Sequence, residues 1–189
     1  QRNIPIRIGV NSGSISKEIV DKFGGVNADS LVASAMEEIK ILEDMDFYDM
    51  KISVKSSDVN TMIDAYRKLS DLVDYPLHLG VTEAGPLYQA LVKSSIGIGS
   101  LLKDGIGDTI RVSITGDPVE EVKAAKTILK SLNLSHDGLD IVSCPTCSRT
   151  TVNLEEIVAE VEEKAAGLGV DAKIAIMGCP VNGPGESKE

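Results

Sequence analysis

The sequence predicts an α/β protein with a parallel sheet, followed by a second, smaller α/β domain. Strand-like and helix-like segments alternate four times over about the first 130 residues, a rhythm typical of βα units. Apolar residues make up 42% of the 189 residues, which is enough for a sizeable core. Aromatic residues make up only 3%, so we expect a core of Ile, Val, Leu and Ala.

The elements of the first part are recognised by the spacing of their apolar residues. Apolar positions alternate in strands and recur every three or four residues in helices. Ser57 or Asp58 is expected to cap the second helix, and Asp117-Pro118 to begin the fourth. The predicted elements are strands at residues 4–10, 51–55, 77–82 and 108–115, and helices at residues 30–44, 58–72, 87–103 and after 117.

The last third of the chain is organised differently. A polar stretch over residues 132–138 predicts a joint, with domains at residues 1–134 and 135–189. The elements expected in the second domain are a strand at residues 139–143, a helix at 154–166 and a strand at 172–177. Each of these strands runs directly into a cysteine, Cys144 or Cys179, and strand ends are where parallel α/β sheets place ligands.

Each of the first four strands is apolar on one face and polar on the other. Parallel strands covered on both faces are apolar almost throughout, so this polar face needs an explanation. Its cations are Arg7, Lys51, Lys55, His78 and Arg111, in a chain with a net charge of −10. Salt bridges to acids such as Glu83 would explain them, and so would a barrel mouth that binds a polyanion. Their recurrence on several strands favours the anion site, with hydrogen bonds from Asn11, Thr82 and Ser113.

Glu83 follows directly on the third strand, in the sequence TEAG. An acid beside a bound phosphate would be repelled unless it had a chemical task. We therefore expect Glu83 to be either a salt-bridge partner of Lys55 or Arg111, or a group that donates a proton or binds a hydroxyl.

The three cysteines form a second candidate site. Cys144 and Cys147 make a C-x-x-C pair, which predicts a ligand or redox role. Cys179 lies 32 residues further on, and alone it is better explained as a small buried residue. A thioredoxin-like motif fits poorly, because residues 148–153 delay the helix that should follow the pair.

Three cysteines do not complete either of the usual metal sites. Zinc needs a fourth ligand, and an iron–sulfur cluster normally takes four cysteines. Glu186 is a candidate oxygen ligand, seven residues after Cys179, although a solvated acid is the simpler explanation.

Charge and hydropathy exclude several classes of function. A net charge of −10 argues against non-specific binding to nucleic acid or anionic lipid, because both repel a negative surface. No run of 18 apolar residues predicts a transmembrane helix, and no signal peptide is recognisable. The chain begins at Gln1, directly on a strand-like segment, and we expect it to be a fragment with both ends as cuts.

Six segments are long enough to be compared with known families: IPIRIGVNSGS, KISVKSSDV, PLHLGVTEAG, GIGDTIRVSITGDPVEEV, CPTCSRT and GCPVNGPGE. In this order they resemble the 4-hydroxy-3-methylbut-2-enyl diphosphate synthases, the iron–sulfur reductases of the non-mevalonate isoprenoid pathway. The resemblance covers nearly the whole chain, and the combination of CPTCSRT with GCPVNGPGE is highly specific.

The resemblance implies a fold and a cofactor. The family has an N-terminal (β/α)₈ barrel and a C-terminal α/β domain that carries a [4Fe–4S] cluster. The chain would then be the second half of a TIM-type barrel followed by most of the small cluster domain. The implied cluster ligands are Cys144, Cys147, Cys179 and Glu186, so the resemblance overrides the simpler explanation of Glu186.

The resemblance also implies a reaction and its residues. The substrate is 2-C-methyl-D-erythritol 2,4-cyclodiphosphate, which a two-electron reduction opens and dehydrates to 4-hydroxy-3-methylbut-2-enyl diphosphate. Glu83 matches the essential acid of the family. The implied substrate-binding residues are Arg7, Asn11, Lys55, Thr82, Arg111 and Ser113.

The implied partners are reduced flavodoxin or ferredoxin as electron donor, and a second copy of the chain in a homodimer. Bacteria and plastids both use the pathway, so the implied location is the bacterial cytoplasm or, as the alternative, a plastid. Because the first half of the barrel is missing, we expect the fragment alone to be inactive.

Two other functions remain open on the residues alone. A non-catalytic zinc- or cluster-binding module would need only the cysteines. A phosphosugar-binding barrel aldolase would use Lys55 to form a Schiff base.

Overall fold

The computed structural model describes residues 4–136, 138–165 and 171–183. The chain divides into two compact units, Gln1–Leu132 and Asn133–Glu189, a division two residues before the predicted joint at residues 134 and 135. The first unit alternates strands with helices, and the second contains two strands and one helix among its described residues.

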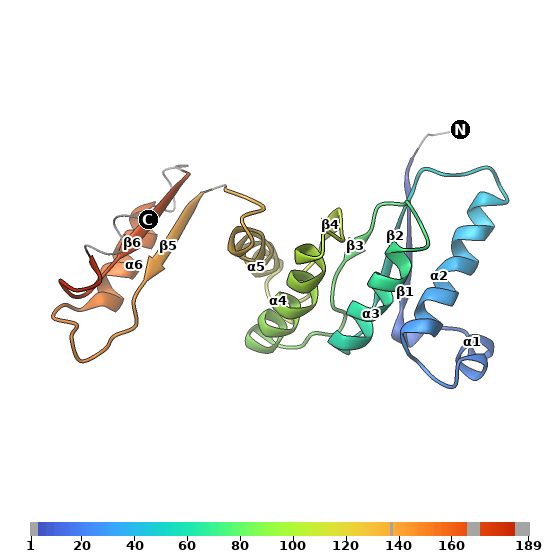
Figure 1. Ribbon diagram of the computed structural model, residues 1–189, viewed down its shortest axis with the longest axis horizontal. Coiled ribbons are helices and arrows are strands. Elements are labelled where there is room, and N and C mark those ends of the chain that lie inside the picture. Colours follow the sequence, from blue (N-terminus) through green and yellow to red (C-terminus); the bar gives the residue numbers. More distant parts are fainter. Residues whose placement is uncertain (1–3, 137, 166–170, 184–189) are drawn as a thin grey trace. The chain divides into compact units, whose positions relative to one another are not determined.

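The strands of the first unit run parallel and lie side by side in chain order (Figure 1). β1 (Ile6–Asn11) pairs with β2 (Met50–Lys55) along its whole length. β3 (His78–Leu79) pairs with β4 (Thr109–Ile110) over two residues. A single bridge between Ile52 and Leu77 joins β2 to the start of β3.

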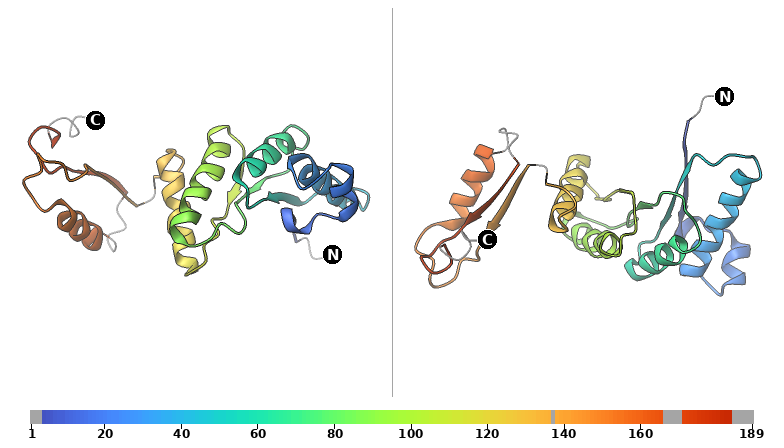
Figure 2. Two further views of the ribbon diagram at one scale, coloured as in Figure 1. Left: turned by 90° about the horizontal axis from the view of Figure 1, so that it is seen from below. Right: turned by 45° about the horizontal axis from the view of Figure 1, so that its top comes forward.

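The main helices of the first unit lie side by side in chain order, each in contact with the next (Figure 2). Asp58 caps α3, accepting a hydrogen bond from the Thr61 N–H, and Asp117 caps α5. The helices are α1 (Lys17–Lys22), α2 (Ala28–Glu43), α3 (Val59–Ser70), α4 (Leu87–Lys103) and α5 (Pro118–Ser131), with a 3₁₀ turn η1 (Ser12–Ser14).

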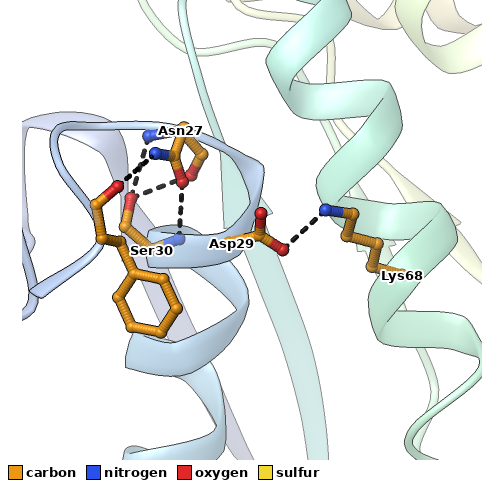
Figure 3. A network of polar contacts seen from close by, with 5 residues as sticks. Asn27, Asp29, Ser30 and Lys68 are labelled. Carbon is orange, nitrogen blue, oxygen red and sulfur yellow. Dashed lines mark hydrogen bonds and ion pairs between the residues drawn. The ribbon is translucent and has the colours of Figure 1, made fainter.

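Polar contacts at the beginning of α2 cap this helix and connect it to α3 (Figure 3). Asn27 accepts a hydrogen bond from the Ser30 N–H at 3.0 Å, and the Ser30 hydroxyl accepts one from the Asn27 N–H at 2.9 Å. This reciprocal capping box begins the helix. Asp29 in its first turn then forms an ion pair of 2.6 Å with Lys68 of α3, which connects the two helices on their solvent side.

The buried face of the strands is the predicted apolar face. Ile52, Val54 and Leu79 are fully buried, and they pack with side chains of α2, α3 and α4 in one aliphatic core. Ile6 was expected on this face, but it is exposed at the beginning of β1. Helices therefore cover one side of the strands, and the polar side chains are left on the other.

Two predicted strands are much shorter than expected. The segments 77–82 and 108–115 pair regularly over only two residues each, in β3 and β4. Beyond them the chain is held by single backbone hydrogen bonds, from Arg111 N–H to the Leu79 carbonyl and from Thr82 N–H to the Ser56 carbonyl. The alternating pattern continues through such irregular segments, which is why it did not reveal where pairing stops. The pattern also missed η1 and α1, which are too short to show a helical period.

Tyr66 of α3 links β2 to β3 inside the core. Its side chain is fully buried, its hydroxyl accepts a hydrogen bond from the Val54 N–H at 3.1 Å, and it donates one to the His78 carbonyl. Burial raises the pKa of Tyr66 above its ordinary value, so the hydroxyl keeps its proton. One side chain thus satisfies two backbone groups at the junction where the two strands share a single bridge.

The second unit is a small strand–helix–strand arrangement. β5 (Leu139–Ser143) and β6 (Ala172–Ile176) are parallel, with Leu139 opposite Ala172 and Ser143 opposite Ile176. α6 (Leu154–Ala165) lies between them in the chain. β5 has the predicted bounds, whereas β6 ends one residue before the predicted Met177.

We expect Tyr66→Phe to lower the free energy of unfolding by about 1–3 kcal/mol, because it leaves the Val54 N–H and the His78 carbonyl buried without a partner. The measurement is the denaturant midpoint of the full-length protein at unchanged m-value. Tyr88→Phe is the control, because Tyr88 is 84% exposed. Equal midpoints for the two variants would contradict the role of the hydroxyl.

Candidate functional site

The register of the strands brings the polar side chains of the first unit to one face. Arg7 stands opposite Lys51, Asn11 opposite Lys55, and His78 opposite Thr109. Lys55 is only 7% exposed, whereas Arg7 lies at the exposed edge strand. The predicted polar face therefore contains a lysine that is almost removed from water.

Gly80 makes room for the end of the Lys55 side chain. A Cβ at Gly80 would lie 3.1 Å from both Cε and Nζ of Lys55, and 2.8 Å from the Arg111 carbonyl oxygen. No larger residue fits there without moving the backbone. The lysine ammonium is thus placed over Gly80, just beyond β3, next to the segment that carries Arg111.

The cations of this face lie close enough to repel one another. Burial, and after it the positive charges of Arg7 and Arg111, lower the pKa of Lys55 to about 8, against a smaller opposing effect of Glu121. Among the described residues no ion pair joins Arg7 or Lys55 to an acid. A bound anion would offset this repulsion, so the arrangement fits the predicted anion site better than internal salt bridges.

His78 was counted with the cations, but the structure makes it neutral. Burial and the neighbouring cations, led by Lys55 and Arg7, lower the pKa of His78 to about 4. Its Nδ1 lies 2.8 Å from the Thr109 hydroxyl oxygen. At neutral pH the ring is therefore a polar, uncharged part of this face.

Glu121 is a neighbour of the site that the sequence did not reveal. Its Oε2 lies 3.6 Å from Nε of Arg111, and its Oε1 accepts a hydrogen bond from the Ile114 N–H at 2.9 Å. The sequence offers Glu83 as one example of an acidic partner for Arg111, whereas the structure places Glu121 there. The only signal for Glu121 is its place in the first turn of α5, just after the segment that continues β4 and carries Arg111.

Glu83 is exposed, and its backbone has the unusual φ of +51°. Residues with a Cβ rarely adopt this left-handed conformation, which costs about 1–3 kcal/mol. Hydrogen bonds hold the chain on both sides, from Thr82 N–H to the Ser56 carbonyl at 3.2 Å and from Thr115 N–H to the Gly85 carbonyl at 3.0 Å. Among the described residues Glu83 forms no ion pair with Lys55 or Arg111.

The remaining predicted contacts also lie at strand ends. Asn11 is the last residue of β1, and its N–H donates a hydrogen bond to the Ser14 hydroxyl at 3.1 Å. Thr82 and Ser113 are partly exposed, in the segments that continue β3 and β4. Hydroxyl and amide groups in these places are suited to hydrogen bonding with phosphate oxygens.

The second unit holds the cysteines in two loops, one after each strand. Cys144 follows β5 and is partly exposed, Cys147 is exposed, Cys179 is buried, and all three are free thiols. The Gly178 N–H donates a hydrogen bond to Sγ of Cys144 at 3.5 Å, and the Thr151 N–H donates one to the Gly178 carbonyl at 3.1 Å. These bonds join the CPTC loop to the loop that carries Cys179.

The donor set fits an iron–sulfur cluster in its chemistry. Hydrogen bonds from Arg149, its backbone N–H first, lower the pKa of Cys147, which favours the thiolate that metals bind. The described residues contain no group of three or more His, Cys, Asp or Glu side chains that converge on one ion. A cluster does not need such convergence, because each ligand binds a different iron. Glu186, the predicted fourth ligand, lies outside the described residues.

Residues 1–126 match a family model described as the GcpE TIM-barrel domain, and residues 140–189 match the GcpE protein C-terminal domain. Within the described residues, no helix is both long and apolar enough to cross a bilayer.

Three similar curated proteins all have the name 4-hydroxy-3-methylbut-2-en-1-yl diphosphate synthase (flavodoxin). They come from Clostridium tetani, Fusobacterium nucleatum and Clostridium perfringens, and are 58%, 60% and 57% identical over all 189 residues. The matched region is 54%, 53% and 54% of their own lengths. The chain therefore spans about half the length of the curated relatives it matches.

We expect polyanion binding to weaken as the pH rises through 8, because Lys55 loses its proton there in the free protein. The affinity of the full-length protein for inorganic pyrophosphate should fall about tenfold between pH 7 and pH 9, since ~90% of the lysine is charged at the first and ~10% at the second. Lys55→Arg stays charged and should remove this dependence. The same pH profile in both proteins would rule out Lys55 as the titrating group.

The free energy of unfolding should rise as the pH rises from about 8 to 10.5, whereas the affinity for the anion falls. The pKa of Lys55 is lower in the folded protein than its ordinary value of 10.5, so the unfolded chain binds more protons between about pH 8 and pH 10.5. The cost of burying the charge is thus present below pH 8 and is relieved as the pH rises.

We expect Glu83→Gly to raise the free energy of unfolding by about 1 kcal/mol, because glycine adopts a positive φ without strain. Glu37→Gly, at an exposed position inside α2, should lower it by about 1 kcal/mol. Denaturant unfolding of both variants makes the comparison. If Glu83→Gly were as destabilising as Glu37→Gly, the backbone at Glu83 would not be strained.

Proposed function

The chain belongs to the GcpE family, and on that premise we propose that the protein is a 4-hydroxy-3-methylbut-2-enyl diphosphate synthase. Its reaction would be the two-electron reductive ring opening and dehydration of 2-C-methyl-D-erythritol 2,4-cyclodiphosphate. The first unit would be the second half of a (β/α)₈ barrel, and the second unit a cluster domain. The twofold greater length of the relatives supports this division.

The gathering of Arg7, Lys55 and Arg111 on one strand face carries the proposal. Burial first, and after it the charges of Arg7 and Arg111, lower the pKa of Lys55, so an anion bound at this face would favour its charged form. The cyclic diphosphate has the complementary charge. The two arginines suit bidentate contacts with phosphate oxygens, and Asn11, Thr82 and Ser113 add uncharged hydrogen bonds.

Glu83 would act on the non-phosphate part of the substrate. Glu83 follows the segment that continues β3 and carries Gly80 and Thr82, and its backbone has the left-handed φ of +51°. Loss of a hydroxyl as water requires a proton on the leaving oxygen, and an exposed carboxylic acid at this place can hold or supply it.

Cys144, Cys147, Cys179 and Glu186 would hold the cofactor, a [4Fe–4S] cluster. When bound, the cluster supplies the two electrons one at a time. The thiolates and their N–H donors belong to the chain, and the electrons come from a partner. The names of the relatives favour flavodoxin over ferredoxin as the donor. We further propose a homodimer and, because these relatives are bacterial, a location in the bacterial cytoplasm.

The test is turnover of the cyclic diphosphate by the full-length protein with reduced flavodoxin. Glu83→Gln should lower kcat by about 10²–10⁴-fold with little effect on KM, because the proton function is lost while the binding cations remain. Lys55→Gln should mainly raise KM. Glu37→Gln, on the exposed face of α2, is the control and should behave as the wild type.

Two results would favour the other functions. A wild type that binds its metal but does not turn over the cyclic diphosphate, with unchanged metal binding in Glu83→Gln, would point to a structural cysteine module without catalysis. Trapping of a substrate on Lys55 by borohydride would point to an aldolase.

A further inference from the structure

Thr150 occupies the contact between the two cysteine loops. Its N–H donates a hydrogen bond to the Cys147 carbonyl at 2.9 Å, and its hydroxyl oxygen lies 4.0 Å from Sγ of Cys147. The side chain is partly exposed. Thr150 is thus tied to the CPTC loop through both its backbone and its hydroxyl.

The methyl group of Thr150 is directed at the other loop. A Cβ at Gly178 would lie 2.7 Å from Cγ2 of Thr150, closer than side chains pack, and 3.4 Å from its hydroxyl oxygen. Gly178 in turn donates its N–H to Sγ of Cys144 and accepts a hydrogen bond from the Thr151 N–H. The threonine methyl and the bare glycine therefore fit each other at the residue before Cys179.

We propose that Thr150 is a positioning residue of the cluster site, with separate tasks for its methyl and hydroxyl groups. This inference rests on the proposed cluster. The methyl group packs against Gly178 and sets the spacing between the loop of Cys144 and Cys147 and the loop of Cys179. The hydroxyl donates a hydrogen bond to Sγ of Cys147 when that sulfur is a thiolate ligand.

The second task has an electronic consequence. A thiolate has no proton to donate, so the Thr150 hydroxyl must be the donor in this pair. A hydrogen bond to a ligand sulfur withdraws negative charge and makes it easier to add one electron to the cluster. Thr150 therefore raises the reduction potential of the bound cluster.

Two conservative variants separate the tasks. Thr150→Val keeps the methyl packing and removes the hydroxyl, so the cluster should load normally but have a lower reduction potential. We expect the reduction potential to fall by at most ~59 mV, which corresponds to a tenfold change in the one-electron reduction equilibrium. Thr150→Ser keeps the hydroxyl and removes the methyl, so the potential should stay and the iron content should fall.

A double variant tests the contact itself. Gly178→Ala should lower the iron content, because its Cβ meets the Thr150 methyl at 2.7 Å. Adding Thr150→Ser removes that methyl and leaves the hydroxyl oxygen at 3.4 Å, which is ordinary contact. The double variant should therefore hold more iron than Gly178→Ala alone, a rescue that a general loss of folding would not produce.

The experiment uses the full-length protein after anaerobic reconstitution. Iron and acid-labile sulfide are measured for each variant, followed by a redox titration monitored by the visible spectrum. Thr151→Val is the control, because its exposed side chain is replaced while the N–H that bonds Gly178 is kept. Its potential and iron content should match the wild type.

The outcomes distinguish this inference from the proposed function. About four iron and four sulfide in the wild type, a lower potential in Thr150→Val and rescue in the double variant would support it. The same cluster in the wild type with no change of potential and no rescue would overturn the role of Thr150 alone. A wild type without iron and sulfide would overturn both.

Discussion

The junction between β2 and β3 is the contact on which the first unit depends. The two strands share one bridge, at Ile52 and Leu77, and the Tyr66 hydroxyl supplies the next connection by bonding to both backbones. The junction also fixes how Lys55 of β2 lies over Gly80, just beyond β3. The hydrogen bonds of Tyr66, on the face of the strands that the helices cover, therefore help to position Lys55 on the polar face.

The two faces of these strands have different energetics. The apolar face is stabilised by burial under α2, α3 and α4, in an ordinary aliphatic core. The polar face is unfavourable in the free protein at Lys55, whose ammonium is nearly buried and is also repelled by Arg7 and Arg111. Burial of the apolar face offsets the unfavourable free energy of the polar face. This is the usual relation between a stable scaffold and a binding site.

Much of this arrangement was predictable because it depends on local patterns. Alternation along the strands placed Arg7, Lys55 and Arg111 on one face, and the capping roles of Asp58 and Asp117 follow from their position before helical segments. In the cysteine region, the CPTC and GCP sequences after strands indicated two neighbouring loops.

The features that escaped prediction depend on distances between elements. The neutrality of His78 results from burial combined with cations on other strands, and Glu121 reaches Arg111 from a helix. Pairing in β3 and β4 covers only two residues, and alternation along one strand does not record hydrogen bonds to its neighbour. The role of Glu186 still rests on the resemblance, because the residue lies outside the described part of the chain.

The left-handed backbone at Glu83 has a consequence for protein engineering. A selection for thermal resistance alone would favour glycine or asparagine at this position, since both accept a positive φ more readily than glutamate. Such a selection would enrich variants that lack the carboxyl group of residue 83 but unfold at a higher temperature. A thermostabilised version of this protein should therefore be tested at each round for the proposed reaction, with position 83 held constant.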